Sequence, residues 1–300
     1  MDKPRILDLF SGSGGAAKGY EMAGFAPYGV DLDPKPLKHY LYPSLCMDAL
    51  FALEMLLRGD ALVFGQEELR LSDFAAVHAS PPCQGYSIMQ NLPWLRHKTY
   101  PLLILPTIEL LEKTGKPYVL ENVMGARNGA KGLKKRGLEA HGLKAGYLCG
   151  TMFGMGMYRH RLFAANWLWL APEHPKHDFV IRRGRDFGNS GDMANRREAA
   201  CWPWMTQREQ RQAIPPAYTE HIGQQLMLSM ASRNEGQKEK RMAQLQWCRW
   251  CGRKHRTEVK PCPRCHCGTP QPVSAKVAEQ CYTDYECEIC HESRGYERVE

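Results

Sequence analysis

Short apolar runs alternate with amphipathic stretches in the first part of the chain. Residues 5–10 and 28–31 have strand character, and a glycine turn and a helix-like stretch at residues 16–24 lie between them. Two later apolar runs, residues 74–79 and 117–121, are strand-like and end close to polar or proline residues. This alternation is typical of an α/β fold with a doubly wound, mostly parallel sheet, which binds its ligands beyond the carboxyl ends of the strands.

The pattern becomes polar after two more strand-like runs at residues 147–153 and 161–170. Residues 171–211 are irregular and rich in arginine and aromatic residues, which suits a loop-built surface for nucleic acid, although a solvated basic loop has the same composition. A helix is expected at residues 218–230, with a polar helical linker after it. The basic and aromatic residues of the irregular stretch are Arg182, Arg183, Arg185, Phe187, Arg196, Arg197, Trp202, Trp204, Arg208 and Arg211.

Composition and charge favour a folded protein with a polyanionic partner. The chain has 300 residues, of which 43% are hydrophobic, and a formal net charge of +8. No apolar run approaches the roughly 20 residues that cross a bilayer, and the first residues lack the apolar stretch of a signal peptide. We therefore expect a cytoplasmic protein without a membrane partner, either associated with the nucleoid or, if a phage encodes it, in the host cytoplasm.

Cysteines are concentrated near the carboxyl-terminal end. Eight of the 12 cysteines follow Gln246, most of them in Cys-x-x-Cys pairs, and in a reducing compartment this spacing favours structural Zn²⁺ over disulfides. One or two ions fit, the pairing stays open, and His255, His266 and His291 are alternative ligands. The eight expected ligands are Cys248, Cys251, Cys262, Cys265, Cys267, Cys281, Cys287 and Cys290.

Two motifs bring candidate chemistry to the predicted sheet edge. The glycine turn at residues 8–15 lets a ligand approach the backbone, and with Asp31 it favours an adenosine-containing cofactor over a purely structural turn. Cys83 lies in a sharp turn after residues 74–79. It is either a buried structural cysteine or a nucleophile activated by nearby cations.

Charged residues follow at the ends of later strands. A carboxylate at Glu121 would be costly to bury unpaired, so it is either exposed or positioned for a function. Arg159 and Arg161 are separated by one residue, so in an extended segment their side chains share one face.

Together these motifs resemble the DNA (cytosine-5)-methyltransferase family. They occur in the family's order between residues 4 and 230: the glycine turn, Pro81-Pro-Cys-Gln84, Glu121-Asn-Val123, Arg159-His-Arg161 and residues 214–223. The resemblance implies a Rossmann-like class I methyltransferase fold that binds S-adenosylmethionine. It also implies a monomer that methylates cytosine C5 in double-stranded DNA.

The resemblance implies a role for each matching residue. Cys83 would attack C6 of a cytosine flipped out of the duplex, Glu121 would hold the ring at N3 and the amino group, and Arg161, together with Arg159, would stabilise negative charge. The residues that would line the target pocket are Pro82, Gln84, Ser87 and Asn122. The residues that would bind the cofactor are Phe10, Ser11, Gly12, Gly14, Asp31 and Asp48.

Departures from the family pattern concern the substrate more than methyl transfer. Met157 replaces the glutamine of the family's Gln-x-Arg-x-Arg, and Tyr86 stands where phenylalanine is usual. Two alternatives stay open: the same chemistry on RNA, as in tRNA-methylating members, and a nucleic-acid-binding protein without activity. The intact set of Cys83, Glu121 and Arg161 argues against the inactive protein.

These expectations define four regions. Residues 1–170 and 212–231 would form the catalytic domain, and residues 171–211 a short target-recognition region. Residues 232–246 would be a linker to a zinc-ribbon-like module at residues 247–300.

Overall fold

The computed structural model describes residues 2–87, 92–95, 97–126, 141–155, 159–176 and 202–243, together with five short strands between residues 245 and 295. Contacts divide the chain into two units, Met1–Met227 and Leu228–Glu300, and each is described by itself. Within the described helices, none combines the length and the hydrophobicity needed to span a membrane.

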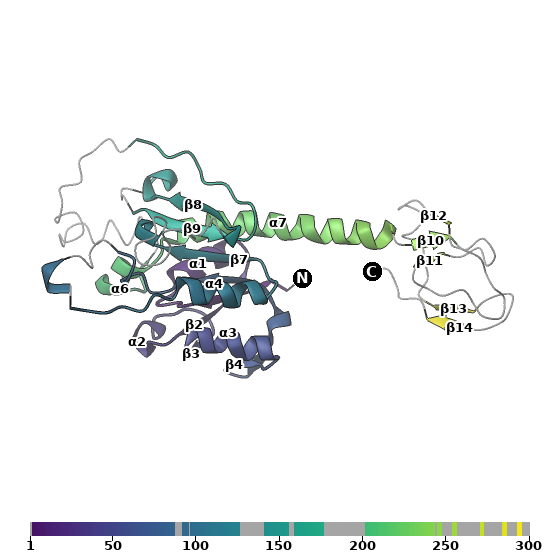
Figure 1. The fold of residues 1–300 in the computed structure, drawn as a ribbon, viewed down its shortest axis with the longest axis horizontal. Coiled ribbons are helices and arrows are strands. Elements are labelled where there is room, and N and C mark those ends of the chain that lie inside the picture. Colours follow the sequence, from purple (N-terminus) through teal and green to yellow (C-terminus); the bar gives the residue numbers. More distant parts are fainter. Residues whose placement is uncertain are drawn as a thin grey trace. The chain divides into compact units, whose positions relative to one another are not determined.

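The first unit is built on a seven-stranded sheet with the order β3-β2-β1-β6-β7-β9-β8 (Figure 1). Neighbouring strands are parallel from β3 through β7, whereas β9 is antiparallel to both β7 and β8. The expected doubly wound, mostly parallel sheet is therefore confirmed. The strands are β1 Arg5–Leu9, β2 Ala26–Asp31, β3 Ser44–Cys46, β6 Phe74–Ala79, β7 Tyr118–Asn122, β8 Lys144–Leu148 and β9 Arg161–Ala165.

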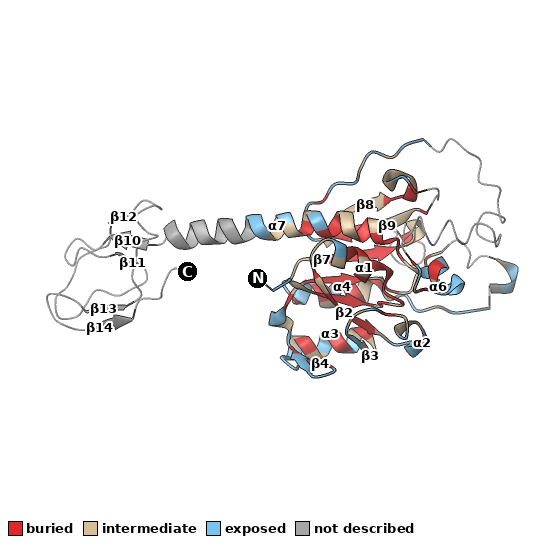
Figure 2. Ribbon diagram, turned by 180° about the vertical axis from the view of Figure 1, so that it is seen from behind, coloured by how far each residue is buried: buried red, intermediate tan, exposed pale blue. Residues whose placement is uncertain are grey.

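Helices cover the two faces of this sheet. Alternate residues of a strand point to opposite faces, so Leu7 and Leu9 join the core packed under α3 and α4, whereas Asp8 points to the other face. On that face, Tyr20 of α1 contacts His78 of β6. Figure 2 shows the buried residues concentrated along the sheet and the helix faces that pack on it. The helices are α1 Gly15–Met22, α2 Pro34–Leu37, α3 Ala49–Arg58, α4 Ile104–Lys113, α6 Gln207–Gln212 and α7 Pro216–Ala243.

Helix α1 packs closely against the start of α7. A Cβ atom on Gly19 would lie 2.1 Å from the carbonyl oxygen of Pro216, and the Thr219 hydroxyl donates to the Ala16 carbonyl at 2.8 Å. Only glycine fits at such a crossing. Residues 216–243 form one continuous helix, so the expected helix and most of the polar stretch after it are a single element.

Two strand predictions were wrong in extent. Residues 147–153 were expected to be one strand, but β8 ends at Leu148 and the 3₁₀ helix η6 Gly150–Phe153 follows, closed by Gly154 at φ 68°. Strand β9 ends at Ala165 instead of continuing to residue 170. Asn166 ends it, because its side chain accepts from the Tyr118 amide at 2.9 Å and donates to the Lys116 carbonyl at 2.9 Å.

Short elements complete the described structure. The hairpin β4 Leu62–Phe64 and β5 Glu67–Leu69 lies in the first unit, with the 3₁₀ helices η1 Leu71–Asp73, η3 Pro93–Leu95 and η4 Met124–Ala126. The second unit contains an antiparallel sheet of the order β11-β10-β12 and the separate hairpin β13-β14. Its strands are β10 Leu245–Trp247, β11 Lys254–Arg256, β12 Gln271–Pro272, β13 Asp284–Glu286 and β14 Ser293–Gly295.

The cysteine-rich tail and part of the arginine-rich stretch lie outside the described residues. All eight cysteines expected to bind Zn²⁺ belong to this part of the chain, as do residues 177–201 of the expected target-recognition region. The zinc-ribbon-like module therefore stays a prediction.

Candidate active site

A cavity of about 970 Å³ opens at the carboxyl ends of β1, β2, β6 and β7. It brings together the glycine turn after β1 and the cysteine turn after β6, as expected for ligand sites at this edge of a parallel sheet. Of the described residues predicted for the site, Gly14, Asn122 and Arg159 lie outside the cavity wall. The predicted residues in the wall are Phe10, Ser11, Gly12, Asp31, Asp48, Pro82, Cys83, Gln84, Ser87, Glu121 and Arg161.

The glycine turn has an unusual backbone. Phe10, Gly12 and Gly14 all have positive φ angles, of 58°, 53° and 84°. Glycine adopts this region freely, but for Phe10 it is strained by roughly 1–2 kcal/mol. A Cβ atom on Gly12 would meet nothing within 4 Å, whereas one on Gly14 would lie 2.9 Å from the Tyr40 ring. Gly12 therefore borders open space, and Gly14 shapes the turn from behind.

Asp31 and Asp48 line the same cavity and also stabilise its backbone. The Asp31 carboxylate accepts from the amide of Gly12 and from that of Asp33, each at 2.8 Å. Asp48 caps α3, because its Oδ1 accepts from the amides of Leu50 and Phe51. Each carboxylate thus holds a loop that contributes to the cavity wall.

Asp8 also lines the cavity, although no role was predicted for it. Burial raises the pKa of its carboxyl to about 8, despite a hydrogen bond from the Tyr40 hydroxyl at 3.1 Å. Its Oδ1 and the Ser11 Oγ are buried and have no hydrogen-bond partner among the described residues. Buried polar atoms of this kind need a partner, so a polar ligand in the cavity would stabilise them.

The cysteine turn places Cys83 half-buried in the cavity wall. The Cys83 carbonyl accepts from the amides of Tyr86 and Ser87, each at 3.0 Å, which closes the turn. Burial is the main factor that raises the pKa of the Cys83 thiol, and the charge of Glu121 adds to it. Arg161 and, more weakly, Arg159 lower this pKa. The surroundings therefore favour the thiol until the local charges change.

Glu121 forms an ion pair with Arg161 at the end of β7. The Arg161 Nε lies 3.1 Å from Oε1 of Glu121, and both side chains are largely buried. Burial raises the pKa of the Glu121 carboxyl, while Arg161, Arg159 and a hydrogen bond from Ser80 oppose this shift. The next residue, Asn122, points the other way and donates from Nδ2 to the Pro81 carbonyl at 2.9 Å, which ties the cysteine turn to β7.

A chain of hydrogen bonds leads from Glu121 into the protein interior. The Ser80 hydroxyl donates to the Glu121 carboxylate, the His78 Nε2 lies 2.8 Å from the Ser80 Oγ, and the His78 Nδ1 lies 3.0 Å from the Tyr20 hydroxyl. Burial lowers the pKa of His78 to about 3, so its imidazole is neutral. Because the Ser80 proton points to Glu121, His78 carries its proton on Nε2 and accepts from Tyr20.

Arg159 makes different contacts from Arg161. Its guanidinium is buried and donates to the carbonyls of Gln210 and Arg211 at 2.8 and 2.7 Å. The Arg159 carbonyl accepts from the Tyr218 hydroxyl at 2.6 Å. These contacts stabilise the carboxyl-terminal end of α6, and Arg159 acts on Cys83 only through its charge.

The cavity wall also contains residues from α6 and the stretch after it, none of which was predicted to line the cofactor or base pocket. Glu209 joins this wall to the loop after α2, because its Oε1 lies 2.8 Å from Nδ1 of His39. The pattern Thr206-x-x-Glu209 forms a capping box, and it is the sequence signal from which this helix could have been predicted. The members of this part of the wall are Glu209, Arg211, Gln212, Ala213 and Ile214.

The sheet order, its antiparallel strand β9 and the edge cavity are consistent with the class I methyltransferase fold. The family model for C-5 cytosine-specific DNA methylases matches residues 4–151, and these residues form a domain of that family. No curated protein matches the chain.

Solved structures give weaker similarities. A prophage-encoded E. coli protein, described as a candidate DNA modification methyltransferase, is 19% identical over 54% of this chain and 46% of its own, with a TM-score of 0.40. The S. pombe Dnmt2 methyltransferase is 18% identical over 56% of this chain and 51% of its own, with a TM-score of 0.35. A mutant of Spodoptera frugiperda DNMT2 is 20% identical over 62% of this chain and 56% of its own, with a TM-score of 0.39. The match thus spans about half the length of these proteins.

Family membership supports the use of S-adenosylmethionine, and the described cavity fits this cofactor. The open space beside Gly12 admits a ligand close to the backbone, and the Ser11 Oγ and Asp8 Oδ1 offer polar atoms to it. The glycine turn and the carboxylates of Asp31 and Asp48 are the donor and acceptor set that an adenosine-containing ligand requires.

Proposed function

We propose that the chain methylates cytosine at C5 in DNA, through a covalent bond between the Cys83 sulfur and C6 of a flipped-out base. The observation that carries this proposal is the shared cavity, whose wall contains the glycine turn, Cys83 and the ion pair of Glu121 with Arg161. A nucleophile, a cofactor cradle and a charged pair for the base then share one cavity.

On the cofactor side, the residues have separate tasks. Phe10 would pack against the adenine, the Asp31 carboxylate would accept from the ribose hydroxyls, and Asp48 would accept from the adenine amino group. Ser11 and Gly12 would border the amino-acid moiety. When bound, S-adenosylmethionine supplies an electrophilic methyl group on its sulfonium centre.

On the base side, Cys83 begins the reaction. C5 of cytosine is a weak nucleophile, but addition of the Cys83 thiolate to C6 makes C5 electron-rich enough to accept a methyl group. Loss of the C5 proton and elimination of the thiolate then restore the aromatic ring, and Cys83 is regenerated. Pro82, Gln84 and Ser87 would form the wall against which the flipped base lies.

Glu121 and Arg161 would control charge during this addition. Glu121 would donate a hydrogen bond or a proton at N3, so that negative charge does not accumulate on the ring. Because the carboxylate raises the pKa of Cys83, a protonated Glu121 would leave the thiol beside Arg161 with a lower pKa. Binding of the base would in this way favour the thiolate.

A direct test is transfer of labelled methyl groups from S-adenosylmethionine to duplex DNA and, in parallel, to tRNA. We expect label in DNA, and we expect Cys83→Ser to abolish transfer while it leaves cofactor binding largely intact. Cys46→Ser, a change at an exposed cysteine outside the cavity, is the matched control. Undiminished transfer by Cys83→Ser would refute the nucleophile.

The RNA alternative keeps the same residues and changes only the substrate. Label in tRNA but not in DNA would support it. Bisulfite sequencing of DNA from cells that express the chain would report base and sequence context together. If the extract transfers methyl groups to tRNA but the genome of the same cells carries no methylated cytosine, DNA is not the substrate.

A further inference from the structure

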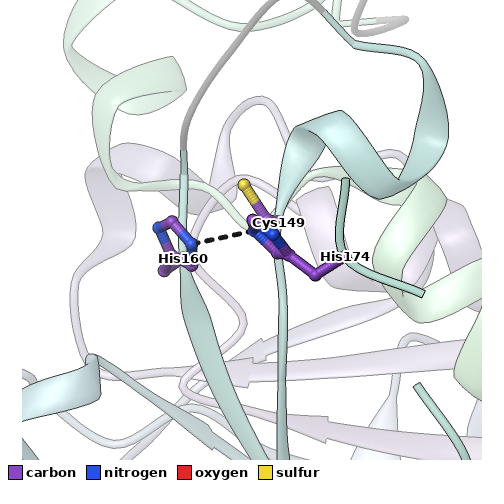
Figure 3. A group of neighbouring side chains, drawn as sticks. All are labelled: Cys149, His160 and His174. Carbon is purple, nitrogen blue, oxygen red and sulfur yellow. Dashed lines mark hydrogen bonds between the residues drawn. The ribbon is translucent and has the colours of Figure 1, made fainter. Parts of the chain in front are cut away.

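Three side chains that can bind a metal ion lie close together beside β8 and β9 (Figure 3). The proposed reaction does not use them. Cys149 follows β8, His160 immediately precedes β9, and His174 belongs to the segment that follows β9. The register of the two strands pairs Leu148 with Arg161, so the next residues outward, Cys149 and His160, lie across from each other. The Cys149 sulfur and one imidazole nitrogen of each histidine all lie within 4.8 Å of one another.

The two imidazoles have the separation of neighbouring ligands on one ion. Their Nε2 atoms are 3.2 Å apart. Zinc–nitrogen distances of about 2.0–2.1 Å in a tetrahedral site place two nitrogens about 3.3–3.4 Å apart. The rings are nearly parallel, at 19° with centroids 5.2 Å apart, and the two nitrogens face each other across the dashed line in Figure 3. Little movement is needed for both to bind one metal ion.

The surroundings support the ligands. Cys149 is fully buried, and the Thr151 hydroxyl donates to its sulfur at 3.3 Å, a contact that orients a ligand sulfur. The Tyr147 ring packs against both imidazoles, with centroid distances of 5.6 Å to each. Tyr147 of β8 thus holds the two imidazoles, and Thr151 of η6 holds the sulfur.

We propose that Cys149, His160 and His174 bind a structural Zn²⁺ ion. One thiolate and two imidazoles are the mixed sulfur and nitrogen donors that zinc prefers, and these three residues include no carboxylate that would favour Mg²⁺ or Ca²⁺. The fourth position of the tetrahedron takes a water molecule or a further ligand. This site is separate from the one or two ions predicted for the cysteine-rich tail.

The position of the ion gives it a consequence for the cavity. It links the end of β8, the start of β9 and the segment that leads to residues 177–201. His160 lies between Arg159, which holds α6, and Arg161, which pairs with Glu121. The ion would therefore fix the backbone from which Arg161 reaches the cavity, and the three ligands are positioning residues.

The test is the zinc content of the purified full-length chain, measured by plasma mass spectrometry. We expect His174→Gln and Cys149→Ser each to contain one Zn²⁺ ion fewer per chain than the wild type. Zinc bound by the tail is common to all variants and cancels in the difference. His141→Gln is the matched control, because His141 is paired with Glu112 away from this cluster, and its zinc content should equal that of the wild type.

His174→Cys separates ligation from packing. A cysteine restores a zinc ligand but not an imidazole, so this variant should regain the ion that His174→Gln loses. Circular dichroism checks that each variant is folded, and if Cys149→Ser fails to fold, the two His174 variants decide. Equal zinc in wild type and folded His174→Gln, or one ion fewer in folded His174→Cys, would overturn the proposal.

Discussion

Phe10 combines a strained backbone with a side chain in the cofactor cavity. Its φ of 58° is unfavourable for any residue with a Cβ atom. Such strain is often retained where a side chain has a function. The ring and the backbone strain can be separated with two substitutions.

We predict that Phe10→Ala and Phe10→Gly both weaken S-adenosylmethionine binding, because both remove the ring. Phe10→Gly also relieves the strain, so its Tm should exceed that of Phe10→Ala, by the equivalent of about 1 kcal/mol. Isothermal calorimetry and thermal denaturation measure the two effects. Cofactor affinity equal to that of the wild type in both variants would remove Phe10 from the site.

The thiol of Cys83 should respond in opposite directions to its two charged neighbours. Arg161→Gln removes a positive charge that lowers the pKa of Cys83, so alkylation by iodoacetamide should need a higher pH. Glu121→Gln removes a negative charge that raises this pKa, so alkylation should proceed at a lower pH, although methyl transfer is lost. Peptide-resolved mass spectrometry follows Cys83, with exposed Cys46 as the internal control. Shifts in the same direction would contradict this arrangement.

Asp8 should make stability depend on pH. Its pKa is raised from 3.8 to about 8 in the fold, so the folded state keeps a proton that the unfolded state releases. The free energy of unfolding should therefore fall as the pH rises from about 4 to about 8. In Asp8→Asn this contribution is absent, so its Tm should gain on that of the wild type between about pH 5 and pH 8. Asp60→Asn, at an exposed carboxylate, keeps Asp8, so its Tm should not gain on that of the wild type over this pH range.

Local motifs made part of the site predictable. Cys83, Glu121 and the glycine turn each lie in a short run whose residue types limit the possible chemistry. Asp8 lies in one of these runs, but its role depends on Tyr40, which is 32 residues away. Cys149, His160 and His174 come from three separate segments without a metal-binding spacing, so only the fold brings them together: β8 pairs with β9, and the segment after β9 returns to this pair.

At the scale of elements, α1, which directly follows the glycine turn, crosses the start of α7 closely. Gly19 lies where a Cβ atom would overlap Pro216 and Thr219. In an ordinary helix, a change from glycine to alanine stabilises by about 0.5–1 kcal/mol. The crossing reverses this sign.

We therefore predict that Gly19→Ala destabilises the protein by about 1–3 kcal/mol, because the two helices must separate. Urea denaturation measures the loss, and Lys18→Ala on the same helix, where an ion pair with partly exposed Glu21 is removed, should cost well below 1 kcal/mol. A Gly19→Ala variant as stable as the wild type would show that the crossing adapts.

Elements inside the sheet were more predictable than those at its end. Strand β6 was expected at residues 74–79 and found there, because a short apolar run between polar residues predicts a buried strand with clear ends. Strand β8 gives way to the 3₁₀ helix that Gly154 closes, and β9 ends before Asn166, whose side chain is hydrogen-bonded to another segment. Side-chain hydrogen bonds of this kind leave no periodic pattern.

At the scale of the whole molecule, a net charge of +8 should dominate encounters with nucleic acid. We predict that binding of Cys83→Ser protein to duplex DNA weakens steeply with salt. Each phosphate contact contributes about −0.9 to the slope in a plot of the logarithm of the binding constant against that of the salt concentration. Fluorescence anisotropy measures it, and a slope near zero would exclude backbone contacts as the main source of affinity.

The hydrogen bond from Asn122 to the Pro81 carbonyl has a consequence for how such an enzyme can change. It ties the loop that carries Cys83 to the strand that carries Glu121, so we expect the two to move together. Surface segments elsewhere can then be lengthened, shortened or exchanged between lineages without retuning the reactive pair. Sequence preference can diversify while the chemistry stays constant.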